Sequence, residues 1–329
     1  PSLWEPRQLG RVLAALLETF PHEAQKLEIT AECNPSSFDA SVAQGFRAAG
    51  VNRISLGVQG LEQERLRFLG RLHDAGSALA ALALATRHFE NVSADLIFGV
   101  DRQLPDVAAS EVEIVVQSGV KHVSAYALTV EPGTQFGELQ RRGRLPLLAD
   151  ELVAESFERV ESTLESHGFE HYEISNYARA GRRARHNLGY WLGEPYLGLG
   201  AGAFGTLPRG GSTVRYRNTP AIERYLAWAD SDAPLVRELW SETSPWVASR
   251  EDLSAETLLQ ERILLGLRLL EGLDVERAEA ETGASFWTDV RKKGIDRWVN
   301  RGALRIDGSR LRLNKTHFLI ADRVLVDLL

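Results

Sequence analysis

The first half of the chain alternates between two patterns of apolar and polar positions. Stretches with the 3.6-residue period of a helix take turns with short apolar runs that are typical of buried strands. Helices are predicted at residues 8–20, 41–50, 64–71, 77–89, 107–119 and 150–168, and strands at 26–33, 52–59, 93–100 and 122–130. Because strands and helices alternate, the pattern predicts an α/β fold in which crossover helices join parallel strands.

The pattern changes after residue 180. Residues 181–250 are rich in Gly, Pro, Trp and Arg and are predicted to be a loop-like extension and linker. Beyond them, helices are predicted at residues 256–272, 286–302 and 317–329. Residues 303–313 alternate around Asp307-Gly308, which indicates a hairpin. We therefore expect three parts, 1–180, 181–250 and 251–329, the last being a small winged-helix-like module.

Polar residues recur where the predicted strands end. Glu32 and Asn34 close one strand, Gln59 closes the next, and Thr129 with Glu131 closes a fourth, while Asp95 lies within the third. In parallel α/β folds the chemistry gathers at the carboxyl edge of the sheet, so these side chains are candidates for one shared site. The alternative for each is a structural role, because polar residues also cap helices and close turns.

Composition and charge are those of a globular protein of enzyme size. The 329 residues are 44% hydrophobic and 25% charged, and 38 Lys and Arg against 45 Asp and Glu give a net charge of −7. This acidic balance disfavours wholesale attraction to nucleic acid, and no nucleic-acid partner is expected. The remaining basis for DNA binding is a basic cluster in the C-terminal module, formed by Arg291, Lys292, Lys293, Arg297 and Arg301.

Two absences from the sequence limit the candidate chemistry. No apolar run approaches the ~20 residues that cross a membrane, so we expect a cytoplasmic protein, with peripheral contact at the inner face of the membrane left open. The single cysteine, Cys33, excludes an internal disulfide and a metal site built only from cysteines of these residues. A lone thiol in an apolar strand is usually an inert small hydrophobe.

Eight short motifs follow one another in an order that resembles one family. They are AECNP, NRISLGVQ, LGRLHD, ADLIFGV, SAYALTVEPGT, YEISNYARAG, HNLGYW and YLGLGAGA. Together they resemble the HemW family of haem chaperones, which are related to the oxygen-independent coproporphyrinogen III oxidases of the radical SAM superfamily. The resemblance covers nearly the whole chain. It implies an open (β/α)6 radical SAM barrel, present in part at residues 1–180, and the C-terminal winged-helix-like module.

The resemblance also implies two cofactors, S-adenosyl-L-methionine and a 4Fe-4S cluster. In the family a CxxxCxxC loop holds the cluster, and we expect that loop upstream of Pro1-Ser2 because these residues contain no such spacing. Matching the motifs residue by residue carries over the S-adenosylmethionine contacts Glu32, Gln59, Arg71 and Asp95. Carboxylates can bind ammonium or hydroxyl groups, and Arg binds a carboxylate bidentately. For Arg71 the alternative is a surface ion pair.

The HNLGYW segment resembles the one that distinguishes haem-binding members from the oxidases. It contains His186, Asn187, Tyr190 and Trp191. Histidine is a common axial ligand of haem iron, and Tyr and Trp offer flat apolar area to a porphyrin, so His186 is the candidate iron ligand. Candidate partners for the propionates are Arg182, Arg183 and Arg185. The alternatives are a hydrogen-bonded structural histidine, or iron ligation by Cys33 or another histidine.

Two positions depart from the family pattern. The usual Pro-Gly-Gln turn reads Asp101-Arg102-Gln103, so a tight turn loses its glycine. Phe204 stands where many relatives have a histidine, so an apolar side chain replaces a polar group or ligand. Both departures make local differences from the family expected.

Two functions remain in view, and no catalytic residue is assigned. The leading hypothesis is a haem-binding chaperone that transfers haem to respiratory enzymes. The alternative is an oxygen-independent coproporphyrinogen III oxidase, in which a 5′-deoxyadenosyl radical abstracts hydrogen from propionate side chains. The resemblance thus leaves open whether the chain is an enzyme. Expected partners are haem or porphyrin and haem-accepting respiratory membrane proteins, with a homodimer left open.

Overall fold

The computed structural model describes residues 2–23, 26–229 and 246–329, and it separates into two compact units. The first unit extends to His186, and the second extends from Asn187 to Leu329. The division falls inside one helix, α8 (Arg185–Trp191). The expected three-part division stays a prediction.

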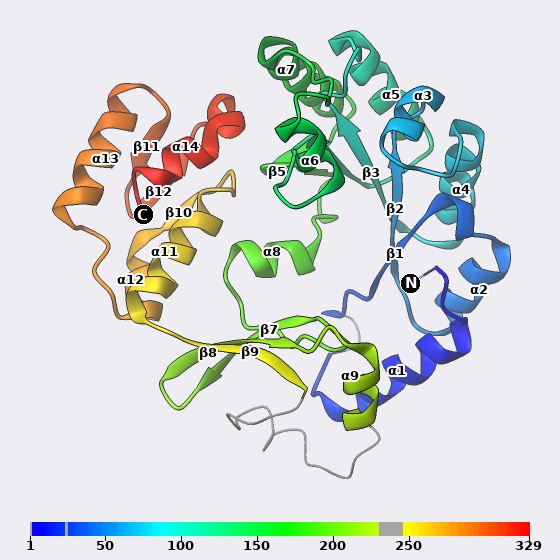
Figure 1. Ribbon diagram of the computed structural model, residues 1–329, viewed down its shortest axis with the longest axis horizontal. Coiled ribbons are helices and arrows are strands. Elements are labelled where there is room, and N and C mark those ends of the chain that lie inside the picture. The colour runs from blue at the N-terminus through cyan, green and yellow to red at the C-terminus, as the bar shows by residue number, and fades with distance from the viewer. Residues whose placement is uncertain (1, 24–25, 230–245) are drawn as a thin grey trace. The chain divides into compact units, whose positions relative to one another are not determined.

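The first unit is built on a six-stranded sheet in the order β1-β2-β3-β4-β6-β5 (Figure 1). Its parallel strands are β1 (Thr30–Cys33), β2 (Arg53–Gln59), β3 (Asn91–Phe98) and β4 (His122–Ala127). β5 (Glu170–Glu173) and β6 (Asn176–Ala178) form an antiparallel pair at the far edge. The predicted parallel α/β sheet is confirmed, whereas the last two strands carried no clear signal in the sequence.

Helices precede, connect and follow the parallel strands of this unit. They are α1 (Pro6–Thr19), the short 3-10 helix η2 (Pro35–Ser37), α2 (Ala40–Ala48), α3 (Gln63–Phe68), α4 (Ala75–His88), α5 (Pro105–Gln117), α6 (Gln135–Arg141) and α7 (Asp150–Ser166). Three of them begin at an acidic cap, because the side chains of Asp39, Glu62 and Asp74 accept hydrogen bonds from backbone N–H groups of the first turn. All but η2 and α6 were predicted.

Successive residues of the parallel strands point to opposite faces of the sheet. One face is apolar and buried, with Ile54, Leu56, Val92, Ala94 and Val123 among its members, and it belongs to the core that the helices cover. The other face carries small polar and charged side chains at the alternate positions of the same strands. The polar face is therefore the one that can present a site.

The second unit contains a three-stranded antiparallel sheet that the sequence did not predict. Its strands are β7 (Phe204–Arg209), β8 (Ser212–Asn218) and β9 (Val247–Leu253), in the order β7-β8-β9, and α9 (Ile222–Ala229) follows β8. The expectation of a loop-like region at 181–250 is therefore wrong where these elements are described. Tyr216 and Trp246 form the buried centre of this sheet, and packing between residues far apart in the chain leaves little trace in local composition.

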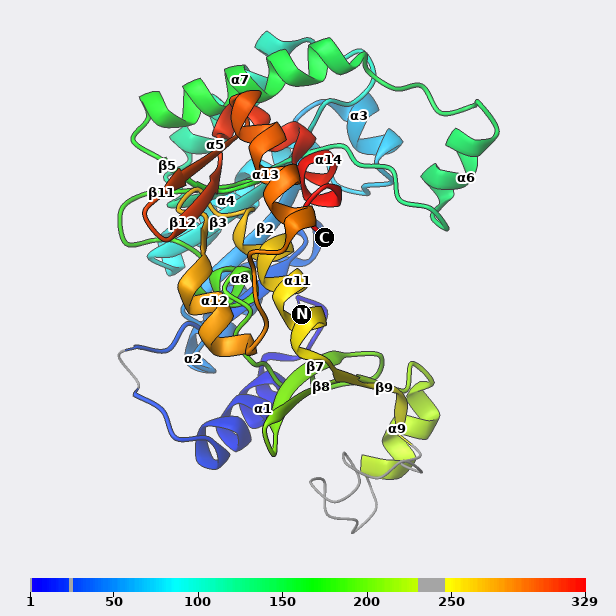
Figure 2. The same cartoon turned by 90° about the vertical axis from the view of Figure 1, so that its left-hand side faces the viewer.

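The C-terminal part of this unit is a helical module with a small sheet in the order β10-β12-β11. It contains α11 (Ala255–Gly266), β10 (Leu273–Asp274), α12 (Val275–Thr282), α13 (Asp289–Asn300), β11 (Leu304–Asp307), β12 (Arg310–Leu313), η3 (Lys315–Ile320) and α14 (Ala321–Val326). Figure 2 shows α13 beside the β11–β12 hairpin. The predicted hairpin is confirmed, while α12 was missed and α11 ends earlier than predicted.

A close approach explains why a glycine stands at the last position of α11, Gly266. A Cβ atom at this position would lie 2.9 Å from the Cδ1 atom of Leu273, so a side chain would push β10 away.

Among the helices of the described ranges, none is long and apolar enough to cross a membrane.

Candidate functional site

Asp95 is the centre of a polar cluster on the polar face of the first unit's sheet. In the parallel register Glu32 pairs with Ser55, and Asp95 pairs with Gly57 and Ser124, so the side chains of these rows share one face. The Ser55 hydroxyl donates to the Asp95 carboxylate at 3.1 and 3.2 Å. Burial raises the pKa of Asp95 to about 6, and the negative charge of Glu32 adds to the rise, against the opposing effect of hydrogen bonds and Arg53.

Gln59 ends β2 in an unusual backbone conformation. Its φ is +66°, in the left-handed region that side chains seldom adopt, and the register with β3 shifts between Gly57 and Gln59. A Cβ atom on Gly57 would lie 2.8 Å from Nε2 of Gln59 and 3.8 Å from Oδ1 of Asn34. The missing side chain at Gly57 thus makes room for the Gln59 amide beside the polar groups that end β1 and β2.

Arg71 lies in the turn between α3 and α4, in the segment that follows the carboxyl end of β2. Its backbone N–H donates to the Leu66 carbonyl at 2.8 Å, directly after Gly70 with φ +69°. The Nε atom of Arg71 is buried and has no hydrogen-bond partner among the described residues. A buried guanidinium N–H without a partner is costly, so it fits a site completed by an anionic group such as the carboxylate of an amino acid.

Thr129 and Glu131 do not belong to this cluster by their contacts. The Thr129 hydroxyl donates to the Ala127 carbonyl at 3.3 Å, and the Glu131 carbonyl accepts from the hydroxyl of Thr134 at 2.7 Å. Both residues lie after the end of β4, in the segment that leads to α6. Their contacts support the structural alternative.

The sequence reasoning missed a buried chain of hydrogen bonds on the same polar face. His122 contacts the Ser93 hydroxyl through Nδ1 and the Tyr172 hydroxyl through Nε2, both at 2.7 Å, and Tyr172 accepts from the Ala184 N–H at 3.2 Å. Burial lowers the pKa of His122 well below its ordinary value, so the ring is neutral. Polar residues at every second position of otherwise apolar strands were the signal that could have revealed it.

The start of α8 is attached to the opposite edge of the sheet. The Glu28 carboxylate accepts from the Arg185 N–H at 3.1 and 3.2 Å and from the His186 N–H at 3.4 Å. Glu28 lies just before β1, on the side where the parallel strands begin, and it is four residues before Glu32. At about 3.3 Å per residue, roughly 13 Å of extended chain separates the Glu28 and Glu32 backbones. The motif histidine and the Asp95 cluster therefore occupy different edges of the sheet.

Helix α8 divides the HNLGYW motif between two faces. Residues four apart on a helix share a face, which groups His186 with Tyr190 and Asn187 with Trp191. Trp191 is half-buried, and the Arg268 guanidinium lies over its ring at 5.7 Å from the centroid. Tyr190 is 37% exposed and meets Tyr196 edge to face, with centroids 4.7 Å apart. The structure thus gives Trp191 a packing role and leaves Tyr190 at the surface.

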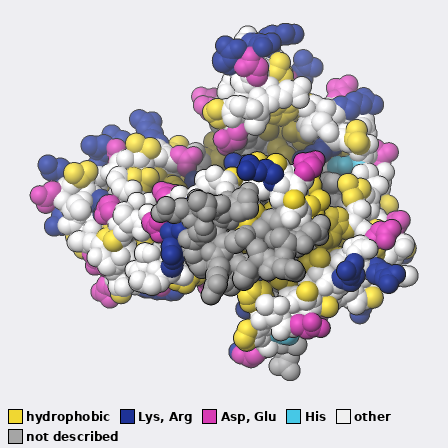
Figure 3. Space-filling model, turned by 60° about the horizontal axis from the view of Figure 1, so that its bottom comes forward, with side chains coloured by type: hydrophobic (Ala, Val, Ile, Leu, Met, Phe, Trp, Pro, Cys, Tyr) yellow, Lys and Arg dark blue, Asp and Glu magenta, His cyan; other side chains and the backbone are white. Residues whose placement is uncertain are grey.

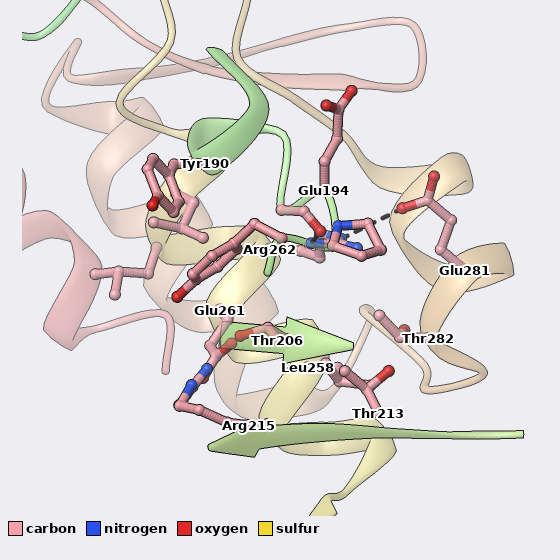
Figure 4. A pocket seen from close by; sticks show the side chains of 15 residues that line it. Tyr190, Glu194, Thr206, Thr213, Arg215, Leu258, Glu261, Arg262, Glu281 and Thr282 are labelled. Carbon is pink, nitrogen blue, oxygen red and sulfur yellow. Dashed lines mark hydrogen bonds and ion pairs between the residues drawn. The ribbon is translucent and has the colours of Figure 1, made fainter. Parts of the chain in front are cut away.

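Tyr190 also lines a cavity of about 360 Å³ within the second unit (Figure 4). The walls come from the end of α8, from β7 and β8, and from α11 and α12, and they include Thr206, Thr213, Leu258 and Leu265. Figure 4 shows Arg262 between Tyr190 and Glu281. Arg262 donates to the Gly193 carbonyl at 2.6 Å and pairs with Glu281 at 3.3 Å.

The second arginine in the cavity wall, Arg215, pairs with Glu261 at 2.5 Å. Both guanidinium groups of the wall are therefore held by the protein, and the carboxylates of Glu194, Glu261 and Glu281 lie in the wall beside apolar and hydroxyl groups. This lining suits the apolar edge of a ring-shaped ligand better than its carboxylates.

The arginines proposed for the propionates have protein partners in the first unit. Arg182 pairs with Glu90, Arg183 lies 3.6 Å from Glu170, and Arg185 donates to the Lys26 carbonyl. A propionate would have to replace these contacts. The propionate role stays a prediction.

The basic cluster of the C-terminal module is not a continuous surface patch. Arg291 is only 3% exposed and pairs with Glu256, while Arg297 pairs with Asp327 at 2.9 Å. On the face shown in Figure 3, basic and acidic side chains are interspersed. These contacts support a structural role for Arg291 and Arg297.

The two departures from the family pattern have clear structural settings. Arg102 adopts φ +61°, so the turn keeps the left-handed conformation that a glycine would adopt freely. Phe204 is about half exposed at the start of β7, with the Arg217 guanidinium 5.2 Å from its ring centroid.

The residues of the described ranges offer no set of ligands for the 4Fe-4S cluster. No group of three or more His, Cys, Asp or Glu side chains there could hold a metal ion. Cys33 is buried, and desolvation raises its pKa to about 11, so the thiol stays protonated at neutral pH. The residues described here thus do not fit the 4Fe-4S cluster, and no step is assigned to it.

Comparison with solved structures and with family models gives the class of the protein, a radical SAM fold. The chain aligns over its whole length with 75% of the coproporphyrinogen III oxidase HemN from Escherichia coli, a radical SAM enzyme, at a TM-score of 0.77 and 19% identity. Residues 1–108 match the Radical SAM superfamily model, and residues 253–319 match the HemN C-terminal domain.

Comparison with curated proteins gives the family. The heme chaperone HemW of Lactococcus lactis is 31% identical over 98% of this chain and 81% of that protein, and HemW of Mycobacterium tuberculosis is 35% identical over 100% and 78%. A bovine protein named radical S-adenosyl methionine domain-containing protein 1, mitochondrial, is 34% identical over 100% and 73%. The chain belongs to the HemW family, and the resemblance read from its motifs is confirmed.

Proposed function

We propose that this protein is a haem chaperone that binds haem and transfers it to respiratory membrane proteins. The observation that carries the proposal is the match to proteins named heme chaperone HemW over nearly the whole chain. The proposal includes recipients in the respiratory membrane, peripheral contact of this protein with that membrane, and a homodimer.

Haem binding is assigned to the face of α8 that carries His186 and Tyr190. Four residues of helix advance about 6 Å, so iron held by His186 would bring the rim of the porphyrin toward the Tyr190 side chain. The Tyr190 ring would give apolar contact with the porphyrin, while its hydroxyl would stay in solvent. Asn187 and Trp191, on the other face, would support the helix instead of touching the ligand.

S-adenosyl-L-methionine is assigned to the carboxyl edge of the first unit's sheet. Arg71 would bind its carboxylate, Glu32 its ammonium group, and Asp95 with Gln59 its ribose hydroxyls and remaining polar groups. The unpaired Nε of Arg71 supports this assignment. When bound with a cluster, this cofactor supplies radical chemistry, while these residues bind and orient it.

The separation of the two edges favours the chaperone over the coproporphyrinogen oxidase. Hydrogen abstraction needs reacting atoms about 3–3.5 Å apart. Haem held by His186 would lie near Glu28, just before β1, whereas the proposed cofactor residues lie within the strands and at their carboxyl ends. An oxidase would instead require the porphyrin propionates at the carboxyl edge.

A haem titration followed by absorbance spectroscopy tests the proposal. The protein should show a stoichiometric Soret shift that His186→Ala weakens strongly and that His22→Ala, a matched change of an exposed histidine, leaves intact. Transfer is then followed by mixing the haem-loaded protein with haem-depleted respiratory membranes. Absence of binding in the unaltered protein would overturn the chaperone proposal, and turnover of coproporphyrinogen by a cluster-reconstituted protein would favour the oxidase.

A further inference from the structure

A buried carboxylate joins two of the turns that end strands of the first unit's sheet. Glu111 of α5 is 7% exposed. One of its oxygens, Oε1, accepts from the Leu61 N–H at 2.7 Å and from Nη2 of Arg65 at 2.5 Å. The other, Oε2, accepts from Nε2 of Gln103 at 2.9 Å. A single side chain therefore connects the turn after β2 with the turn after β3.

The first of these turns begins at Gln59. Its φ of +66° is a strained conformation for a residue with a side chain, and such strain persists only where surrounding contacts hold it. Leu61 is two residues further on, and its N–H is held by Glu111. The carboxylate thus fixes the backbone immediately beyond Gln59.

The second turn begins after β3, the strand that carries Asp95. Arg102 adopts a strained φ of +61°, and the next residue, Gln103, is 1% exposed. The Gln103 amide donates to Glu111, while its carbonyl oxygen accepts from the Val100 N–H at 3.4 Å. The same network therefore fixes the exit of both strands whose ends carry polar ligand candidates.

We infer that Glu111 is a positioning residue for S-adenosyl-L-methionine, holding Gln59 and the exit of the Asp95 strand in their ligand-binding geometry. This inference rests on the cofactor site proposed above. Glu111 acts through the two turns and does not itself touch the ligand.

The hydrogen-bond pattern explains why glutamine cannot replace this carboxylate. A carboxylate accepts on both oxygens, whereas an amide presents one acceptor and one donor group. In Glu111→Gln the oxygen of the new amide can keep the bond from the Leu61 N–H. The NH₂ group of the same amide then points at the NH₂ group of Gln103. If the Gln103 amide rotates instead, its NH₂ group points at the N–H of Val100. If the new amide at position 111 rotates, its NH₂ group points at the N–H of Leu61. Each arrangement leaves two buried donors facing each other, which costs stability locally.

The double variant Glu111→Gln with Gln103→Glu should restore the pattern. The amide at position 111 then donates to the carboxylate at position 103, its oxygen still accepts from Leu61, and the new carboxylate accepts from Val100. Arg65 also keeps a negative charge within the same network. A matched control is Glu256→Gln, which breaks the pair with the buried Arg291 in the second unit.

The test is titration with S-adenosyl-L-methionine by calorimetry, with thermal unfolding measured on the same samples. We expect about tenfold weaker binding for Glu111→Gln, recovery in the double variant and no change for Glu256→Gln. Wild-type affinity in folded Glu111→Gln, or weak binding that the swap does not recover, would overturn the inference and leave the proposed cofactor site standing. Absence of binding in the unaltered protein would instead overturn that site.

A second variant covers the case in which Glu111→Gln fails to fold. Gln103→Met removes the bond to Oε2 of Glu111 and the weaker 3.4 Å bond from the Val100 N–H, and it keeps the contacts of Glu111 with Leu61 and Arg65. We expect a severalfold loss of affinity with the protein folded, and unchanged affinity in this variant would also count against the inference.

Discussion

The Glu28 carboxylate lies 3.1 Å from the backbone nitrogen of Arg185, although the two residues are 157 positions apart in the chain. With its bond to the His186 N–H, Glu28 acts as a cap for the first turn of α8, which would otherwise leave backbone donors without partners. The segment entering β1 thus determines where the motif histidine sits. This contact gives the haem proposal a structural basis outside the motif itself.

Replacing Glu28 should weaken haem binding without changing the motif. Glu28→Ala removes the cap of α8, a loss of about 1 kcal/mol of local stability, and should loosen His186. We expect faster amide hydrogen exchange in residues 185–191 and weaker haem binding in the titration. The control is Glu90→Ala, which removes the partner of Arg182 at an exposed site. Equal effects of the two substitutions would contradict the capping role.

Arg102→Gly should stabilise the protein. Arg102 holds φ +61°, which costs a residue with a side chain about 1 kcal/mol more than it costs glycine. Urea unfolding should therefore show a rise of about 1 kcal/mol in the free energy of unfolding. Arg142→Gly provides the comparison, since Arg142 caps α6 with φ −88° and gains nothing from glycine. A lower stability of Arg102→Gly would show that its side chain contributes more than the strain costs.

The raised pKa of Asp95 predicts a specific pH dependence. Because its pKa is about 6 in the folded protein and near 3.8 when unfolded, the folded state binds more protons between these values. The contribution of Asp95 to stability is thus fully present below about pH 4 and is lost as pH rises through 6. Asp95→Asn should remove this part of the pH dependence and raise the free energy of unfolding at pH 7 by about 2 kcal/mol.

The measurement for Asp95 is chemical unfolding at a series of pH values from 4 to 7. The two proteins should differ most at the upper end of the series. If the free energies of unfolding of the two proteins change with pH in parallel, Asp95 does not titrate in this range. The same variant should bind S-adenosyl-L-methionine more weakly, because a carboxylate is a stronger acceptor for hydroxyl groups than an amide.

The two aromatic residues of the HNLGYW motif should behave differently. Tyr190→Ala should weaken haem binding about tenfold, whereas Tyr190→Phe should keep most of it, since the ring supplies the contact. Trp191→Ala should chiefly lower the thermal stability, because Trp191 packs beneath Arg268. A haem titration and a melting curve for each variant separate the two effects. Loss of haem with Trp191→Ala at unchanged stability would reverse the assignment.

Much of the first unit could be predicted because its signals are local. The apolar run at residues 52–59 became β2 (Arg53–Gln59), and polar residues at the strand ends came together because parallel strands align their carboxyl edges. The three-stranded sheet of the second unit could not be predicted in the same way. Its buried centre, Tyr216 and Trp246, joins residues separated by a helix and a connecting segment, so its stability is absent from any short window.

The sequence alone determined the order of strands and helices, the family motifs, and the positions of Glu32 and Gln59 at strand ends and of Asp95 within a strand. Period and spacing are properties of neighbouring residues. Only the tertiary structure decided that His186 lies at the opposite edge of the sheet from Asp95, that Trp191 is packed while Tyr190 is exposed, and that Glu111 joins two turns. Each of these relationships depends on contacts between residues far apart in the chain. Local patterns of hydrophobic and polar positions do not record which distant residues meet.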